Sequence, residues 1–66
     1  MDPNANLREQ EVLLARYTVA DRRRLRELRK ALATWLTNGG FDPQWAEYPH
    51  AARYFKQLRL YVDAGR

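Results

Sequence analysis

Apolar residues recur every three or four positions along most of the chain, the spacing of one face of an α-helix. The clearest stretch is residues 19–37. Its apolar stripe consists of Leu25, Leu28, Leu32, Trp35 and Leu36. Before it, Thr18 and Asp21 have the spacing of a capping box, and after it Asn38-Gly39-Gly40 supplies a left-handed residue that ends helices. We therefore predict a helix over residues 19–37.

A second, weaker stripe precedes this helix. At about 100° per residue, its apolar members share a sector of about 120° that excludes Val12. They are Leu7, Leu13, Leu14 and Tyr17. Asp2-Pro3 is typical of an N-cap followed by the first helical position, and Asn6 offers a second start. We predict a helix over residues 3–17 that forms an antiparallel hairpin with residues 19–37, or that continues into it as one bent helix.

Prolines divide the segment that follows the glycine pair. Asp42-Pro43 favours a short helical turn over residues 43–47, and Pro49 disfavours helical geometry at Tyr48. Beyond this corner we predict a third helix over residues 50–63, ended by Gly65. Its stripe consists of Ala51, Tyr54, Phe55, Leu58, Tyr61 and Val62.

These elements predict one all-α domain over residues 1–66, in which a third helix packs across a helical hairpin. Two domains do not fit into 66 residues, and leucine and alanine occur nine times each while isoleucine is absent. Several aromatic residues surround the glycine turn and the proline corner, and we expect them to fill the core where the helices meet. They are Trp35, Phe41, Trp45, Tyr48 and Tyr54.

Charge adds a candidate binding surface. The formal net charge is +4, and ten of the twelve basic residues are arginine. Five cations occupy an arc of about 120° on the predicted helix 19–37, opposite its apolar stripe. We call them the arginine face: Arg22, Arg23, Arg26, Arg29 and Lys30. Arg24 and Glu27 lie outside the arc. Like charges on one face repel each other, so an anionic partner would explain the arrangement, although a solvated helix face also accounts for such a run.

A different surface offers an alternative interface. Leu60 points away from its apolar stripe towards Arg53, Lys56 and Arg59, and Val12 is a similar outlier on the first helix. Leucine rimmed by basic groups can mark a contact between proteins. Because a core of this size stabilises a chain only marginally, self-association through these residues is a second interpretation.

Catalysis, cofactors and metal sites are not expected. Cysteine and serine are absent, and the single histidine, His50, has only Glu47 close to it in sequence. A catalytic His-Glu pair needs a nucleophile or a metal and a substrate pocket, so we interpret His50 as a residue of the helix start or of the corner before it. We interpret the remaining carboxylates as caps and ion-pair partners. They are Glu9, Glu11, Asp21, Glu27 and Asp63.

The sequence predicts neither a membrane span nor a signal peptide. No apolar run approaches the roughly 18 residues that cross a bilayer, and the N-terminus lacks a basic start with an apolar stretch. We therefore expect a cytoplasmic protein.

Three motifs within residues 2–45 resemble those of small orphan proteins encoded by bacteriophages of actinobacteria. The motifs are Asp2-Pro3-Asn4-Ala5-Asn6-Leu7, Asp21-Arg22-Arg23-Arg24-Leu25, and the run Trp35-Leu36, Gly39-Gly40-Phe41, Pro43-x-Trp45. The resemblance implies a helical N-terminal part and a phage origin, with the cytoplasm of an infected bacterium as the location. It carries over no activity, and this chain is richer in arginine before the tryptophan.

Together these observations favour a non-catalytic binding protein. In the first hypothesis the arginine face engages a host macromolecule, either a nucleic-acid backbone or an acidic protein surface. Base-specific recognition is not expected, because Asn38 is the only nearby side chain with suitable amide chemistry. In the alternative hypothesis the protein is an interaction or self-assembling module that uses its apolar outliers and its aromatic corner.

Overall fold

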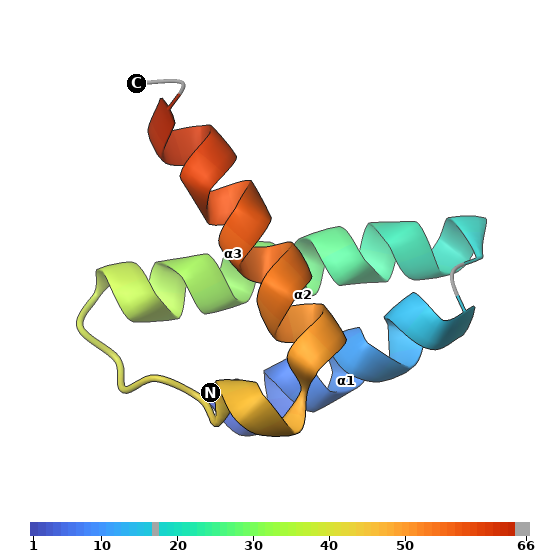
Figure 1. Ribbon diagram of the computed structural model, residues 1–66, viewed down its shortest axis with the longest axis horizontal. Helices are drawn as coiled ribbons and strands as arrows, with labels where there is room; N and C mark the ends of the chain where they lie inside the picture. The colour runs from blue at the N-terminus through green and yellow to red at the C-terminus, as the bar shows by residue number, and fades with distance from the viewer. Residues whose placement is uncertain (17, 65–66) are drawn as a thin grey trace.

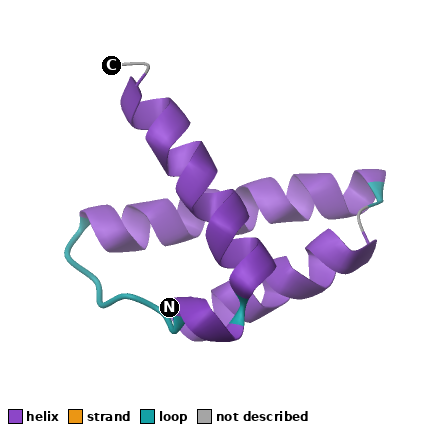
Figure 2. Ribbon diagram, viewed as in Figure 1, coloured by secondary structure: helices purple, strands orange, loops and turns teal. Residues whose placement is uncertain are grey.

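The computed structural model describes residues 1–16 and 18–64, with side chains described up to residue 57 apart from residue 17. The described chain contains three α-helices and one short 3₁₀-helix, and no strand (Figure 1, Figure 2). The elements are α1 (Pro3–Arg16), α2 (Val19–Thr37), η1 (Trp45–Glu47) and α3 (Pro49–Ala64). The predicted all-α class is confirmed.

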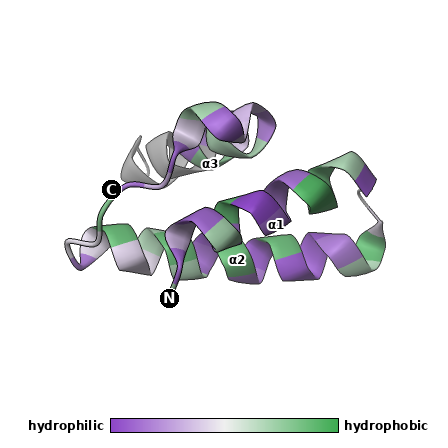
Figure 3. Ribbon diagram, turned by 90° about the horizontal axis from the view of Figure 1, so that it is seen from below, coloured by the Kyte–Doolittle hydropathy of each residue, from purple (hydrophilic) through white to green (hydrophobic). Residues whose placement is uncertain are grey.

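Helices α1 and α2 form an antiparallel hairpin, and α3 crosses it in a second layer (Figure 1, Figure 3). The chain reverses direction between Arg16 and Val19, so the alternative of one bent helix is wrong. Helix α3 packs mainly on α1 and η1, and its last turns extend beyond the hairpin (Figure 1). The predicted hairpin with a third helix across it is therefore present.

Local capping sets the starts of the first two helices. Asp2 Oδ1 accepts hydrogen bonds from the backbone N–H groups of Asn4 (3.0 Å) and Ala5 (3.3 Å), so α1 begins at Pro3. The alternative start at Asn6 is wrong, because Asn6 lies inside α1. At α2, the Asp21 N–H donates to Thr18 Oγ1 and the Thr18 N–H donates to Asp21 Oδ2, both at 3.2 Å. This is the predicted capping box.

Both glycines are needed at the end of α2. Gly39 has φ of 86° and donates its N–H to the Leu36 carbonyl, and Gly40 donates to the Trp35 carbonyl (2.9 Å). This pair of bonds is a Schellman motif. A Cβ on Gly40 would overlap the Trp35 indole, which folds over the turn and donates from Nε1 to the Phe41 carbonyl (2.9 Å).

The segment between the prolines differs from the prediction. The helical turn begins at Trp45 instead of Pro43, and no side chain caps it. The Gln44 N–H is directed to Asn4 Oδ1 of α1 (2.7 Å), which ties this segment to the hairpin instead of to a helix of its own. Helix α3 begins at Pro49, which takes the first helical position that suits proline. The predicted end at Gly65 lies outside the described residues.

Two clusters of buried side chains form the described core. One joins all three helices through Leu7, Leu32, Ala51 and Phe55, and the other joins the hairpin through Leu13, Leu25 and Leu28. The two predicted stripes of the hairpin therefore face inward, with Leu14, Trp35 and Leu36 partly buried beside them. Tyr17 and the stripe residues of α3 beyond Phe55 lie outside the described side chains.

The expectation that five aromatic residues fill the core is confirmed only in part, because four of them pack against the buried clusters and Phe41 does not. Trp35, Trp45, Tyr48 and Tyr54 are half-buried and Phe41 is 62% exposed, whereas Phe55 is the buried aromatic of the described core. The buried position where the three helices meet is occupied by Phe55, together with Leu7, Leu32 and Ala51. The rings pack around the edge instead. Trp45 stacks on Phe55 (5.6 Å between centroids) and Trp35 meets Phe41 edge-on (5.4 Å).

Candidate functional site

The arginine face lies on an unbroken helix, opposite the buried leucines of α2. Arg22, Arg23, Arg26 and Lys30 are exposed, and Arg29 is half-buried. Among the side chains that the structure describes, none of these five cations forms an ion pair; the ion pairs there involve Arg16, Arg24 and His50. Four of the five cations are therefore exposed on one side of α2, as the sequence predicts, and Arg29 is the exception.

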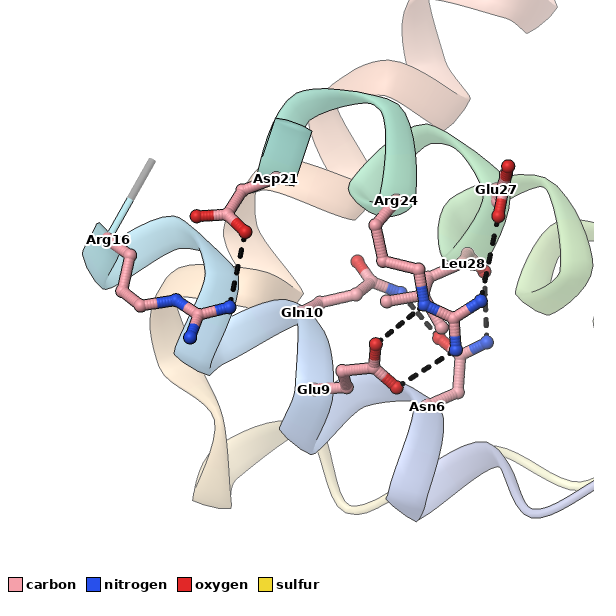
Figure 4. A network of polar contacts seen from close by, with 8 residues as sticks. All are labelled: Asn6, Glu9, Gln10, Arg16, Asp21, Arg24, Glu27 and Leu28. Carbon is pink, nitrogen blue, oxygen red and sulfur yellow. Dashed lines mark hydrogen bonds and ion pairs between the residues drawn. The ribbon is translucent and has the colours of Figure 1, made fainter. Parts of the chain in front are cut away.

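Arg24, which the sequence places outside the face, is neutralised within the hairpin (Figure 4). Its Nε and Nη2 donate to the two carboxylate oxygens of Glu9 in α1, at 2.6 and 3.1 Å, and its Nη1 lies 3.6 Å from Glu27 Oε2. The hydrogen bond from Arg24 lowers the pKa of Glu9 despite desolvation, which opposes it. The same bond raises the pKa of Arg24. Glu9 and Glu27 are thus satisfied without the arginine face.

Asp21 is also occupied within the chain, at the start of α2 (Figure 4). Besides its part in the capping box, it accepts a hydrogen bond of 3.1 Å from Arg16 Nη2. The backbone N–H of Thr18 is the main cause of its lowered pKa, and Arg16 adds to it. The interpretation of Glu9, Asp21 and Glu27 as caps and ion-pair partners is confirmed. Asp63 lies outside the described side chains.

Arg29 differs from the other members of the face because it packs against α3. Its guanidinium carbon lies 4.6 Å from the centroid of the Tyr54 ring. Its Nε and Nη1 are buried, and they have no hydrogen-bond partner among the described residues. Arg29 also lines a hollow of about 150 Å³, which we call the arginine hollow, together with Arg22, Leu25, Arg26 and Tyr54. The sequence does not indicate Tyr54 at this place, because no local pattern shows which helix covers Arg29.

Two polar side chains inside the hairpin also differ from the sequence-based expectation of an apolar interface. Asn6 and Gln10 are buried between α1 and α2. Asn6 Nδ2 donates to the Leu28 carbonyl (3.0 Å), and Gln10 Nε2 donates to Asn6 Oδ1 (2.6 Å; Figure 4). Their spacing of four residues, on the same side of α1 as Leu7 and Leu13, is the signal that could have found them. They fix how the two helices meet and are closed off from ligands.

His50 lies at the start of α3, as the sequence predicts, but its partner is Glu11 of α1 and not Glu47. His50 Nδ1 lies 2.8 Å from Glu11 Oε1, and Glu11 Oε2 accepts 2.6 Å from the Ala51 N–H. Desolvation is the largest influence on the pKa of Glu11 and raises it, but the bonds from Ala51 and His50 together leave that pKa lowered. Glu11 therefore caps α3, which confirms its interpretation as a cap.

A larger hollow of about 460 Å³ lies beside this pair, between α1 and α3. It is lined by Glu11, Leu14, Ala15, His50, Arg53, Tyr54 and Gln57. Within the described residues, no cluster of three or more acidic, cysteine or histidine side chains could hold a metal ion. The pair acts on the fold by holding the start of α3.

The residues of the alternative interface are placed separately. Val12 on α1 is 51% exposed. Arg53 lines the 460 Å³ hollow, while the Lys56 ammonium lies 4.9 Å from the centroid of the Trp45 ring. Leu60 lies outside the described side chains. The structure thus gives Lys56 a contact within the chain and shows that Val12 is exposed.

No helix in the described part of the chain combines the length and the apolar composition that crossing a bilayer requires. Comparisons with protein-family models, with curated proteins and with solved structures find no match to this chain.

Proposed function

We propose that this is a non-catalytic binding protein that docks the arginine face of α2 on an anionic macromolecule, either a nucleic-acid backbone or an acidic protein surface. One observation carries the proposal: the five cations have no acidic partner among the described side chains, whereas Glu9, Asp21 and Glu27 next to them are paired with Arg24 and Arg16. The hairpin leaves the positive charge of one face uncompensated, and that charge attracts anions.

The face is also held rigidly enough to bind as a unit. Its residues lie on a 19-residue helix with a capping box at one end, a Schellman motif at the other and three buried leucines opposite. Eight residue steps from Arg22 to Lys30 span about 12 Å of helix. A binder that contacts about five phosphates loses affinity with a slope near −4.5 in a plot of log K against log salt.

Charge-reversal variants test this function. In Arg22→Glu with Arg26→Glu, two exposed members of the face are reversed, so we expect binding to a short DNA duplex and to polyglutamate to be lost. The matched control is Arg53→Glu with Lys56→Glu, which changes the net charge equally on α3 and should keep most of the affinity. Equal losses in both variants, or wild-type binding that does not respond to salt, would rule the proposal out.

The resemblance of residues 2–45 to small phage proteins indicates in which cell the protein would act. A protein made by a phage in an infected cell would meet the nucleic acids and proteins of its host. Recovery from a host lysate with and without nuclease would then separate the two classes of partner, because only a nucleic-acid partner is lost after nuclease treatment.

Self-association is the second candidate, and the exposure of Val12 favours it. A dimer seam that includes Val12, Arg53, Lys56 and Leu60 would remove this apolar side chain from water. Sedimentation of Val12→Asp and Leu60→Asp tests it. A wild-type dimer that becomes monomeric in both variants, while Arg22→Glu with Arg26→Glu leaves it intact, would support this function in place of the first.

A further inference from the structure

We infer that the arginine hollow between α2 and α3 is a phosphate site that seats one backbone phosphate of a nucleic acid, with Arg29 as its central donor. The inference rests on the proposed function and narrows it from anionic macromolecules in general to nucleic acid. It also divides the arginine face into two parts. Arg22, Arg26 and Arg29 line the hollow, while Arg23 and Lys30 lie outside it.

Arg29 is the reason for assigning a ligand to this place. Buried donors are nearly always satisfied by protein or by ordered water, yet the buried Nε and Nη1 of Arg29 have no partner within the described part of the chain. An unpaired charged group is costly, and the Arg29 guanidinium also lines the hollow, so a phosphate bound there would compensate it through a charge-assisted hydrogen bond. The exposed members of the face have no unpaired donors of this kind, since water can hydrogen-bond to them.

Tyr54 holds this donor in position before a ligand arrives. The Arg29 guanidinium carbon lies 4.6 Å from the centroid of the ring, a contact in which the ring attracts the cation. Tyr54 itself is half-buried on α3 and packs beside Leu13, Leu25 and Leu28. A side chain that is already ordered loses little conformational entropy on binding, so Arg29 contributes more to affinity than a mobile surface arginine.

The size and charge of the hollow fit a phosphate. Its volume of about 150 Å³ is below the roughly 300 Å³ at which pockets for small organic molecules begin. Three of its five lining residues are arginines and none is acidic. The planar guanidinium offers two parallel donors to a phosphate, which a lysine ammonium does not.

The spacing of the cations favours nucleic acid over an acidic protein. Five cations lie within about 12 Å along α2. Duplex DNA carries about one charge per 1.7 Å of its axis as a consequence of its covalent structure. A protein surface with comparable charge would have to crowd carboxylates together against their mutual repulsion. Flanking phosphates would then meet Arg23 and Lys30, outside the hollow.

Two charge-conserving variants test the inference. Arg29→Lys keeps the charge but removes the planar donor from the hollow, so we expect its dissociation constant for a short DNA duplex to rise about tenfold, with the salt slope unchanged. Arg23→Lys is the matched control on the same face and should alter the dissociation constant by less than about twofold. Equal effects of the two variants would overturn the phosphate site while leaving the charge-driven function in place.

A measurement on the wild-type protein tests the inference even if Arg29→Lys does not fold. On addition of the DNA duplex, the Nε–H resonance of Arg29 should shift more than that of Arg23 in ¹⁵N NMR spectra. An unmoved Arg29 resonance, or tighter binding to polyglutamate than to DNA, would overturn the inference. If neither polyanion binds in a salt-dependent manner, the proposed function fails as well, so the two failures are distinct.

Discussion

Glu11 of α1 caps the first turn of α3, because its Oε2 accepts a hydrogen bond of 2.6 Å from the backbone N–H of Ala51. Its other oxygen lies 2.8 Å from His50 Nδ1. A helix cap is usually supplied by the residue just before the helix. Here the cap comes from another helix, 40 residues away in the chain, so it also fixes where α3 sits on the hairpin.

The cap makes stability depend on pH. The pKa of Glu11 in the folded protein is lowered from its ordinary value of 4.5, and the pKa values of Glu9 and Asp21 are lowered as well. Their contribution to the free energy of unfolding is therefore complete above the pKa values of the unfolded chain. It is lost as the pH falls through the lowered pKa values of the folded protein. Urea unfolding from neutral to strongly acidic pH should show this loss.

Replacing the cap separates Glu11 from the other carboxylates. Glu11→Ala leaves the Ala51 N–H without its acceptor, so we expect the free energy of unfolding at neutral pH to fall by about 0.5–2 kcal/mol. The acid dependence of stability should become shallower, since one lowered pKa is gone. Glu47→Ala removes an exposed carboxylate near the same corner and serves as the control. A control as damaging as Glu11→Ala would contradict the capping role.

The sequence pattern predicts those elements whose ends are set by residues close by in the sequence. The bounds of α2 agree residue for residue with the prediction, because a capping box and a glycine pair both act within a few residues of the helix ends. The turn at residues 43–47 was misplaced, because the Gln44 N–H bonds to Asn4 across the fold. The cap from Glu11 is a contact of the same long-range kind.

The candidate site likewise has one part that the sequence predicts and one part that depends on how the helices pack. Helical periodicity alone places Arg22, Arg26 and Arg29 on one face, so the face could be predicted. The Tyr54 ring over Arg29 depends on the angle at which α3 crosses the hairpin, and that angle follows from the packing of Ala51 and Phe55. No periodicity within one helix contains this information, so the hollow could be found only in the structure.

The two glycines after α2 should differ in how well they tolerate a side chain. Gly39→Asn should be tolerated, because asparagine adopts left-handed backbone more readily than other residues and nothing surrounds the position. Gly40→Ala should lower the free energy of unfolding by about 1–3 kcal/mol, because the new Cβ displaces the Trp35 indole.

Tryptophan fluorescence checks the cause of that loss. In a Trp45→Phe background, which leaves Trp35 as the single tryptophan, Gly40→Ala should shift the emission to longer wavelength as the indole moves into water. Gly39→Asn should leave the emission unchanged. An unshifted spectrum in Gly40→Ala would show that the turn adapts without moving Trp35.

The capping box predicts how the hairpin responds at its other end. Thr18→Ala removes the Oγ1 that accepts from the Asp21 N–H at 3.2 Å, so we expect a loss of about 0.5–2 kcal/mol in the free energy of unfolding. Thr37→Ala, at the exposed last residue of α2, is the control and should change stability little. Denaturant unfolding of the two variants measures the difference. Equal stabilities would contradict a role for the box in holding the hairpin.

Asn6 and Gln10 give the sharpest test of what holds α1 against α2. Asn6→Leu removes the bond to the Leu28 carbonyl and leaves the buried Gln10 amide without its partner, so we expect a loss of about 1–3 kcal/mol in the free energy of unfolding. Gln10→Leu leaves Asn6 Oδ1 without its donor and should also destabilise the fold.

The double variant distinguishes the pair from two independent residues. Asn6→Leu with Gln10→Leu removes both polar groups, so no unpaired amide remains between the helices, and the double variant should be more stable than the sum of the single losses predicts. A double-mutant cycle by urea unfolding measures this coupling. Additive losses would mean that the bond of 2.6 Å between the two side chains contributes nothing, and that each acts only through its own contacts with the neighbouring helix.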